Sequence, residues 1–221
     1  MGTEPPDYPK GLEEAVGRIR AIMEWSQVER VLDTDIQPGT VVAFDGAMWA
    51  GIKGIDNMLA RIIDKAKDKR IILCGVSKKS MLVHRSRPLI PTVQMMGDAH
   101  LPNSKWHYPL ETSDYSGKLF GSIYLARLHS RSRYVFRVDL SLPGDFGPAQ
   151  AFGRLAYYAD DPTYVGYPYP LARVHNDVAF SRAEVNDIRA MLRSKAMANG
   201  MDPKEWQITF QDFHEILDRS R

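Results

Sequence analysis

The stretch that most constrains the fold is Thr40–Ala50, with the sequence TVVAFDGAMWA. Val41–Phe44 is an uninterrupted β-prone run after a Pro-Gly turn, which is typical of a strand buried on both faces. Asp45 then places a carboxylate at the end of the strand, which is the edge where open sheets hold ligands and metal ions. An Asp-Gly pair is also a common turn in which the aspartate caps its own backbone, so the motif alone leaves both interpretations open.

A helical segment and a second apolar strand follow. Ile55–Lys67 has the apolar spacing of an amphipathic helix, and Arg70–Ser77 contains the run IILCGVS. Strand, helix and strand in this order predict a parallel βαβ unit with a right-handed crossover. Its second strand would bring cations to the same sheet edge as Asp45, namely Lys78, Lys79, Arg85 and Arg87. These cations either contact phosphate groups or are ordinary surface side chains.

Composition indicates one α/β domain of ordinary globular type, because 44% of the 221 residues are hydrophobic and 25% are charged. The net charge of +2 means that any nucleic-acid-binding face must be local.

The single cysteine, Cys74, excludes a disulfide framework and fits a reducing compartment. No stretch is apolar enough to span a bilayer, and the proline-rich residues 1–10 do not form a signal peptide. We therefore expect a flexible N-terminal arm and a cytoplasmic protein without membrane contact.

A helix is expected from Gly11 to about Leu32, with an apolar stripe that runs through Leu12, Val16, Ile19 and Met23 and then drifts to Val28 and Val31. Glu24 is spaced at i, i+4 and i+7 with Val28 and Val31, so its carboxylate is expected to tilt toward the packed face. The alternative is a glutamate at the edge of the stripe, with its stem buried and its head in water.

The middle of the chain is less informative. Pro88–Pro109 contains four prolines and is expected to be irregular, and His100 and His107 within it lack ligand partners at zinc spacing. Leu119–Leu128 and Tyr134–Leu140 predict two antiparallel strands. Ala149–Tyr158 is expected to be a short helix.

The last third of the sequence contains the clearest helix-start and helix-end motifs. In the run GYPYPL at Gly166–Leu171, Pro170 is placed to open a helix that carries His175. A capping box at Ser181–Glu184 predicts a second helix from Arg182 to Asn199, with Gly200 as its C-cap and Pro203 as its stop. His175 is either a functional residue or a partly buried helix histidine. Tyr167 and Tyr169 form a rigid aromatic platform for packing or for stacking on a base.

The run GYPYPLARVH followed by NDVAFSRAEV resembles the C-terminal block of the NurA nuclease family. Further blocks follow the order of that family from about Arg20 to Asp202. They are a helical Arg20-x-x-x-Glu24, the strand-end Asp45-Gly46, the run GVSKKS at Gly75–Ser80, an isolated Asp98, and RVDL at Arg137–Leu140, where the family tends to have Arg-Val-Glu.

The resemblance implies an RNase H-like α/β fold, a mixed sheet flanked by helices, in a single domain over residues 11–221. It also implies a nuclease that uses Mn²⁺ or Mg²⁺ to resect DNA ends, forms a homodimer and works with the hexameric translocase HerA. Asp45, Glu24 and His175 look like the metal-binding residues, and Tyr167 looks like the tyrosine that lines the site. Phosphate or base contacts are expected from Lys78, Lys79, Arg85 and Tyr169.

One departure from the family concerns its first strand, which ends in Asp-Gly-Ser and supplies a principal metal ligand. This chain is expected to lack that strand, so its metal site would be incomplete. Either a second chain supplies the missing carboxylate, or the protein is a catalytically inactive adaptor that binds a translocase ring or DNA ends. A third possibility is an α/β domain with an unrelated ligand.

Overall fold

The structure is a computed structural model that describes residues 11–49, 55–84, 86–110 and 119–209. The chain divides into two compact units, Met1–Arg173 and Val174–Arg221, and each is described by itself. The arm expected at residues 1–10 lies outside the described residues. The expectation of a single domain over residues 11–221 stays a prediction.

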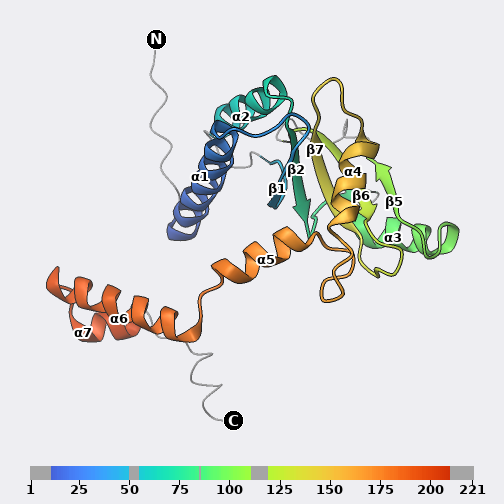
Figure 1. Cartoon of the computed structure of the whole chain (residues 1–221). Helices are drawn as coiled ribbons and strands as arrows, with labels where there is room; N and C mark the ends of the chain where they lie inside the picture. The colour runs from blue at the N-terminus through green and yellow to red at the C-terminus, as the bar shows by residue number, and fades with distance from the viewer. Residues whose placement is uncertain (1–10, 50–54, 85, 111–118, 210–221) are drawn as a thin grey trace. The chain divides into compact units, whose positions relative to one another are not determined.

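The first unit is built on a five-stranded mixed sheet (Figure 1). Its spatial order is β1-β2-β7-β6-β5, in which β1 and β2 are parallel and every other neighbouring pair is antiparallel. The strands are β1 (Val41–Asp45), β2 (Ile72–Ser77), β5 (Trp106–Pro109), β6 (Ser122–Arg127) and β7 (Phe136–Ser141). A separate two-stranded ribbon consists of β3 (Val83–His84) and β4 (Arg87–Pro88). The predicted mixed α/β sheet, including the parallel β1–β2 pair, is confirmed.

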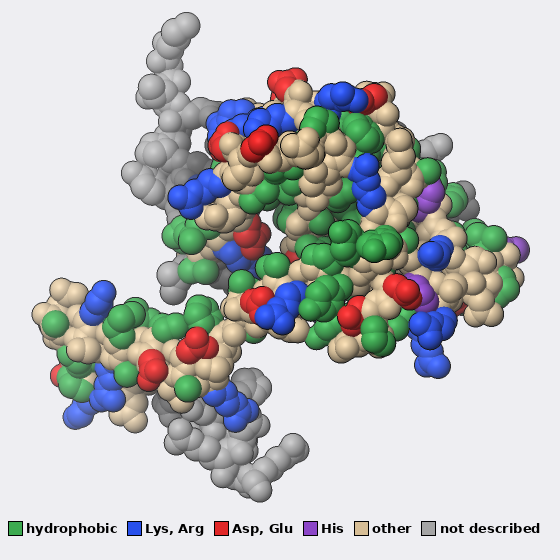
Figure 2. Space-filling view, viewed as in Figure 1, with side chains coloured by type: hydrophobic (Ala, Val, Ile, Leu, Met, Phe, Trp, Pro, Cys, Tyr) green, Lys and Arg blue, Asp and Glu red, His purple; other side chains and the backbone are tan. Residues whose placement is uncertain are grey.

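Helices cover the two faces of this sheet. The helices α1 (Leu12–Asp33) and α2 (Asp56–Asp68) lie on one side, and α4 (Pro148–Tyr157) lies on the other (Figure 1). The remaining helices are α3 (Leu89–His100), α5 (Tyr169–Val178), α6 (Arg182–Ala198) and α7 (Pro203–Thr209). Over α1 and α2, acidic and basic side chains are interspersed (Figure 2). In the part of the chain that the structure describes, none of these helices has the length and apolarity that a bilayer crossing would need.

One hydrophobic core, which we call the α1/α2 core, joins these two helices to the sheet. It contains Trp25, Val28 and Leu32 of α1, and Phe44 of β1 packs against it. The rings of Trp25 and Phe44 meet edge to face, with their centroids 4.7 Å apart. The buried side of α1 therefore includes Val28 of the expected stripe, whereas Val16, Ile19, Met23 and Val31 are exposed.

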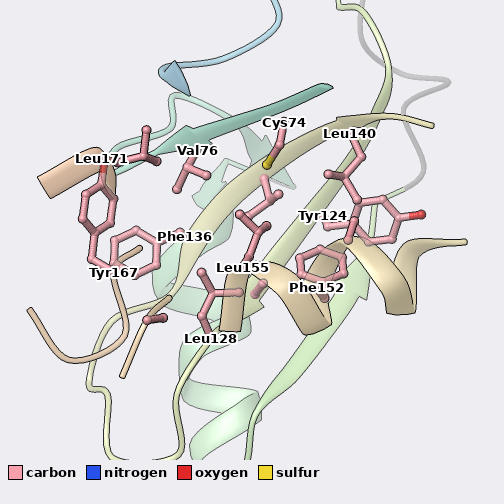
Figure 3. Close-up of a cluster of buried hydrophobic side chains, with 14 of the residues drawn as sticks. Cys74, Val76, Tyr124, Leu128, Phe136, Leu140, Phe152, Leu155, Tyr167 and Leu171 are labelled. Carbon is pink, nitrogen blue, oxygen red and sulfur yellow. The ribbon is translucent and has the colours of Figure 1, made fainter. Parts of the chain in front are cut away.

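The opposite face of the sheet carries the α4/α5 core (Figure 3). It combines Cys74 and Val76 of β2 with Phe152 and Leu155 of α4. Tyr167 closes one end of this core, and its ring lies 5.3 Å from that of Phe136.

One expectation from proline was wrong. Pro88–Pro109 is mostly regular, because it contains the last residue of β4, the helix α3 and the strand β5. Pro91 falls in the first turn of α3, where a helix needs no backbone N–H donor. Pro203 lies beyond the end of α6, as expected, and it is also the first residue of α7.

In the second unit, the predicted capping box at the start of α6 is confirmed. The Glu184 backbone N–H donates to Ser181 Oγ over 3.2 Å, and the Ser181 N–H donates to Glu184 Oε2 over 2.7 Å. Gly200 follows the helix with φ +91°, which is a left-handed conformation suited to a helix end.

Candidate functional site

The site begins where the two parallel strands end. Asp45 is the last residue of β1, and Lys78 directly follows β2. Because parallel strands share their carboxyl edge, the two side chains meet there, with Lys78 Nζ 2.8 Å from Asp45 Oδ2. Both side chains are about two-fifths exposed, at 42% for Lys78 and 39% for Asp45. The sequence prediction that this edge gathers a carboxylate and a cation is met by the structure.

Tyr167 enters the same site from a distant part of the chain. The Lys78 ammonium lies 5.1 Å from the centroid of the Tyr167 ring, which is a cation–π distance. Gly166 makes this approach possible, since its φ is +93° and an added Cβ would fall 2.1 Å from Ser132 Oγ. The glycine of the GYPYPL run is thus required by backbone conformation and by close packing. Asp45, Lys78 and Tyr167 together are called the Asp45 cluster below.

The Tyr167 hydroxyl is chemically unusual. It is buried and has no hydrogen-bond partner of good geometry among the described residues. Burial raises the pKa of Tyr167, and the nearby Asp45 carboxylate raises it further. The phenol therefore stays protonated at neutral pH and is available as a hydrogen-bond donor.

A buried ion pair supports the loop that follows Asp45. Asp139 of β7 is fully buried and accepts two hydrogen bonds from Arg137, from Nε at 2.7 Å and from Nη2 at 2.8 Å. It also accepts one from the Met48 backbone N–H at 2.8 Å. Burial raises the pKa of Asp139, and the contacts with Arg137 and Met48 oppose that rise. The carboxylate thus fastens the Gly46–Met48 segment to the centre of the sheet.

Sequence reasoning did not assign Arg137 and Asp139 to the site. A usable signal was present, because the two opposite charges stand two residues apart in a strand of otherwise apolar character. Residues at i and i+2 share one face of a strand, so a buried strand with this pattern indicates a pair that neutralises itself.

Gly75 of β2 allows the strand-end loop to lie close to the sheet. A Cβ at this position would fall 2.6 Å from the Gly46 carbonyl oxygen and 3.0 Å from the Phe44 ring. The backbone after Asp45 can pass over β2 because this residue has no side chain.

The structure leaves Glu24 outside the cluster. Its carboxylate is 62% exposed and pairs with Arg20 of the same helix at 3.4 Å. The helix that carries Glu24 packs on the α1/α2 core, on one face of the sheet. Val41 and Ala43 face the α4/α5 core on the other face, and Asp45 points the same way because alternate residues of a strand share one face. The expectation that Glu24 tilts toward the packed face is therefore wrong, and its role as a metal ligand stays a prediction.

His175 lies on α5, one turn after the buried Leu171, and is exposed. It belongs to the second unit, so its approach to Asp45 also stays a prediction.

The residues described do not fit the Mn²⁺ or Mg²⁺ site that the resemblance implies. Within the described ranges, no group of three or more His, Cys, Asp and Glu side chains is arranged to hold a metal ion. Hard divalent cations need several oxygen ligands, whereas the Asp45 cluster offers one carboxylate that is already paired with an ammonium.

The residues expected to contact DNA have different positions. Lys78 belongs to the cluster, Lys79 is exposed beside it, and Tyr169 is 42% exposed. Arg85 lies outside the described residues. These DNA contacts stay predictions.

Neither a scan against protein-family models nor a search of curated proteins finds a match for the sequence. Among solved structures, the chain is similar to the NurA nuclease from Sulfolobus solfataricus, with 16% identity and a TM-score of 0.44 over 87% of this chain and 56% of that one. It is also similar to human ENDOV, with 16% identity and a TM-score of 0.46 over 85% of this chain and 68% of that one. A further NurA structure has 11% identity and a TM-score of 0.42 over 68% of this chain and 37% of that one.

Two of these three structures are NurA, the family that the sequence resembles. The chain spans little more than half the length of the first nuclease it matches. Because the identities and TM-scores are low, the functional proposal below rests on the residues of this chain.

Proposed function

We propose that this chain is a NurA-like DNA nuclease subunit and that the Asp45 cluster is where a phosphodiester of DNA meets it. The observation that supports this proposal is the convergence of Asp45, Lys78 and Tyr167 at one sheet edge. The three residues come from three separate blocks of the sequence, and each block lies in the order that the family follows.

The chemistry available at this edge suits a phosphate. The Lys78 ammonium can contact a non-bridging phosphate oxygen, and Asp45 holds that ammonium at the strand end. The Tyr167 hydroxyl, kept protonated by its surroundings, can donate to a second oxygen. We infer that these groups bind and orient the backbone of the substrate.

Hydrolysis by a divalent metal needs more carboxylates than the described residues bring together. We propose that a second copy of this chain or another subunit completes the site. In this proposal the working assembly also includes a HerA-type translocase, and Mn²⁺ or Mg²⁺ is the ion supplied in solution.

The second candidate function is a catalytically inactive adaptor that binds DNA ends or a translocase ring. The observation that favours it is the ion pair between Asp45 and Lys78, because this pair occupies the carboxylate that a metal would need. Both candidates predict binding of DNA, and only the first predicts cleavage.

The two candidates are separated by incubating the full chain with linear DNA, with and without Mn²⁺ or Mg²⁺, and measuring binding in parallel. Metal-dependent loss of DNA, abolished by chelation, supports the nuclease. Stable binding with intact DNA under every condition supports the adaptor. Absence of both binding and cleavage would contradict both candidates.

A further inference from the structure

A polar cavity lies in the first unit, between α3 and the loop that follows β6. Its volume is about 440 Å³, within the range of small-molecule sites. Nine residues line it, and most of them carry hydrogen-bonding side chains: Gln94, Asp98, Pro102, Asn103, Arg127, Ser130, Arg131, Ser132 and Arg133. None of these residues belongs to the Asp45 cluster.

The charge of this lining favours an anion. Arg127, Arg131 and Arg133 contribute three guanidinium groups, whereas Asp98 is the one carboxylate among the residues that line it. Asp98 is already paired with Arg127 Nη2. Asp160, which is not among the lining residues, is 2.9 Å from His129 and 4.0 Å from Arg131, so its contact with that arginine is loose.

The second observation is a buried donor without a partner. The Arg127 side chain is only 3% exposed, and its Nε–H makes no hydrogen bond with any described residue. The Arg127 guanidinium lies 5.6 Å from the centroid of the Trp106 ring, and the Trp106 Nε1–H is likewise buried without a described partner. Of these two residues, Arg127 lines the cavity, and a buried donor of this kind is uncommon, since buried polar groups are nearly always hydrogen-bonded.

We propose that this cavity binds a phosphate monoester dianion. A phosphate presents several acceptor oxygens, and arginine forks match that geometry with paired hydrogen bonds. An apolar ligand would leave the guanidinium groups without acceptors, and a cation would be repelled by them. The proposal is independent of the Asp45 cluster, and it fits two sources of the same group, a 5′-phosphorylated DNA end and free phosphate.

The test is calorimetric titration of the full chain with inorganic phosphate, and then with two oligonucleotides of one sequence that carry a 5′-phosphate or a 5′-hydroxyl. The variant is Arg131→Ala/Arg133→Ala, because both side chains are exposed and their removal leaves the buried Arg127 in place. The matched control is Arg30→Ala/Arg193→Ala, which removes the same charge from exposed positions on α1 and α6.

The expected result is saturable phosphate binding that weakens by about tenfold or more in the cavity variant and stays unchanged in the control, since charge-assisted hydrogen bonds are the strong ones. Tighter binding of the 5′-phosphate oligonucleotide than of its 5′-hydroxyl twin identifies the DNA end as the source. Equal binding of the two oligonucleotides, together with saturable binding of inorganic phosphate, identifies free phosphate as the ligand of the cavity.

No saturable phosphate binding, or equal loss in the cavity variant and the control, would overturn the proposal. The failure of this proposal is distinct from that of the nuclease, because the cavity is tested by phosphate binding in the Arg131→Ala/Arg133→Ala variant, whereas the nuclease is tested by metal-dependent loss of linear DNA.

Discussion

Replacing Arg137 by methionine should strongly destabilise the first unit, because Asp139 would then be a buried charge with one remaining donor. In the structure, Asp139 is fully buried and accepts two hydrogen bonds from Arg137 and one from the Met48 N–H. Removing one member of a buried ion pair typically costs about 3–5 kcal/mol. That loss is a large share of the roughly 5–15 kcal/mol that stabilises an ordinary protein.

The assay is urea unfolding followed by circular dichroism at neutral pH. With a slope of about 2 kcal/mol per molar urea, a loss of about 4 kcal/mol lowers the midpoint by about 2 M. The double variant Arg137→Met/Asp139→Leu removes both charges and should recover much of the loss, although the Met48 N–H then lacks its acceptor.

The control is Arg61→Met, which breaks the exposed pair between Arg61 and Glu29. Exposed pairs contribute little, so its midpoint should stay close to that of the wild type. The buried pair does not stabilise the sheet in this way if Arg137→Met unfolds at nearly the same urea concentration as Arg61→Met, or if the double variant is less stable than Arg137→Met alone.

Three further predictions concern the sheet and its edge. Gly75→Ala should lower the free energy of unfolding by about 1–3 kcal/mol, because its Cβ would meet the Gly46 carbonyl at 2.6 Å; an unchanged urea midpoint would contradict this packing. Burial raises the pKa of the Cys74 thiol, so labelling by a thiol reagent at about pH 8.5 should be slow in the native protein and complete after denaturation; fast native labelling would contradict the burial. Tyr167→Phe removes a buried hydroxyl without a described partner, so thermal unfolding should show equal or higher stability; a loss of about 2 kcal/mol or more would mean that the hydroxyl is well paired.

The sheet was predictable where local signals agree. Continuous apolar runs identified β1 and β2, and the helix between them set their parallel arrangement. The buried face of α1 was not predictable, because the helix carries apolar residues on several sides. Packing of Trp25 on Phe44 decides which side is buried, and the sequence of α1 contains no sign of that contact.

The candidate site was likewise predictable only in part. The parallel strands brought Asp45 and Lys78 to one edge as expected, since adjacent parallel strands share that edge. Glu24 was expected there because the resemblance to the NurA family implied a helical glutamate among the metal ligands, but α1 lies on the opposite face of the sheet from the Asp45 side chain. The cavity around Arg127 depends on contacts between α3 and the loop after β6, which no local pattern of the sequence encodes.

The most direct test of the central claim is DNA cleavage by Asp45→Asn, compared with the wild type and with Asp35→Asn. Asp35 is an exposed aspartate before β1, so its variant carries the same loss of charge outside the Asp45 cluster. All three proteins are assayed on linear DNA with Mn²⁺, after confirming equal urea midpoints. We expect metal-dependent cleavage by the wild type and by Asp35→Asn, and none by Asp45→Asn. Cleavage by Asp45→Asn at the wild-type rate would show that the Asp45 carboxylate is not part of the nuclease site.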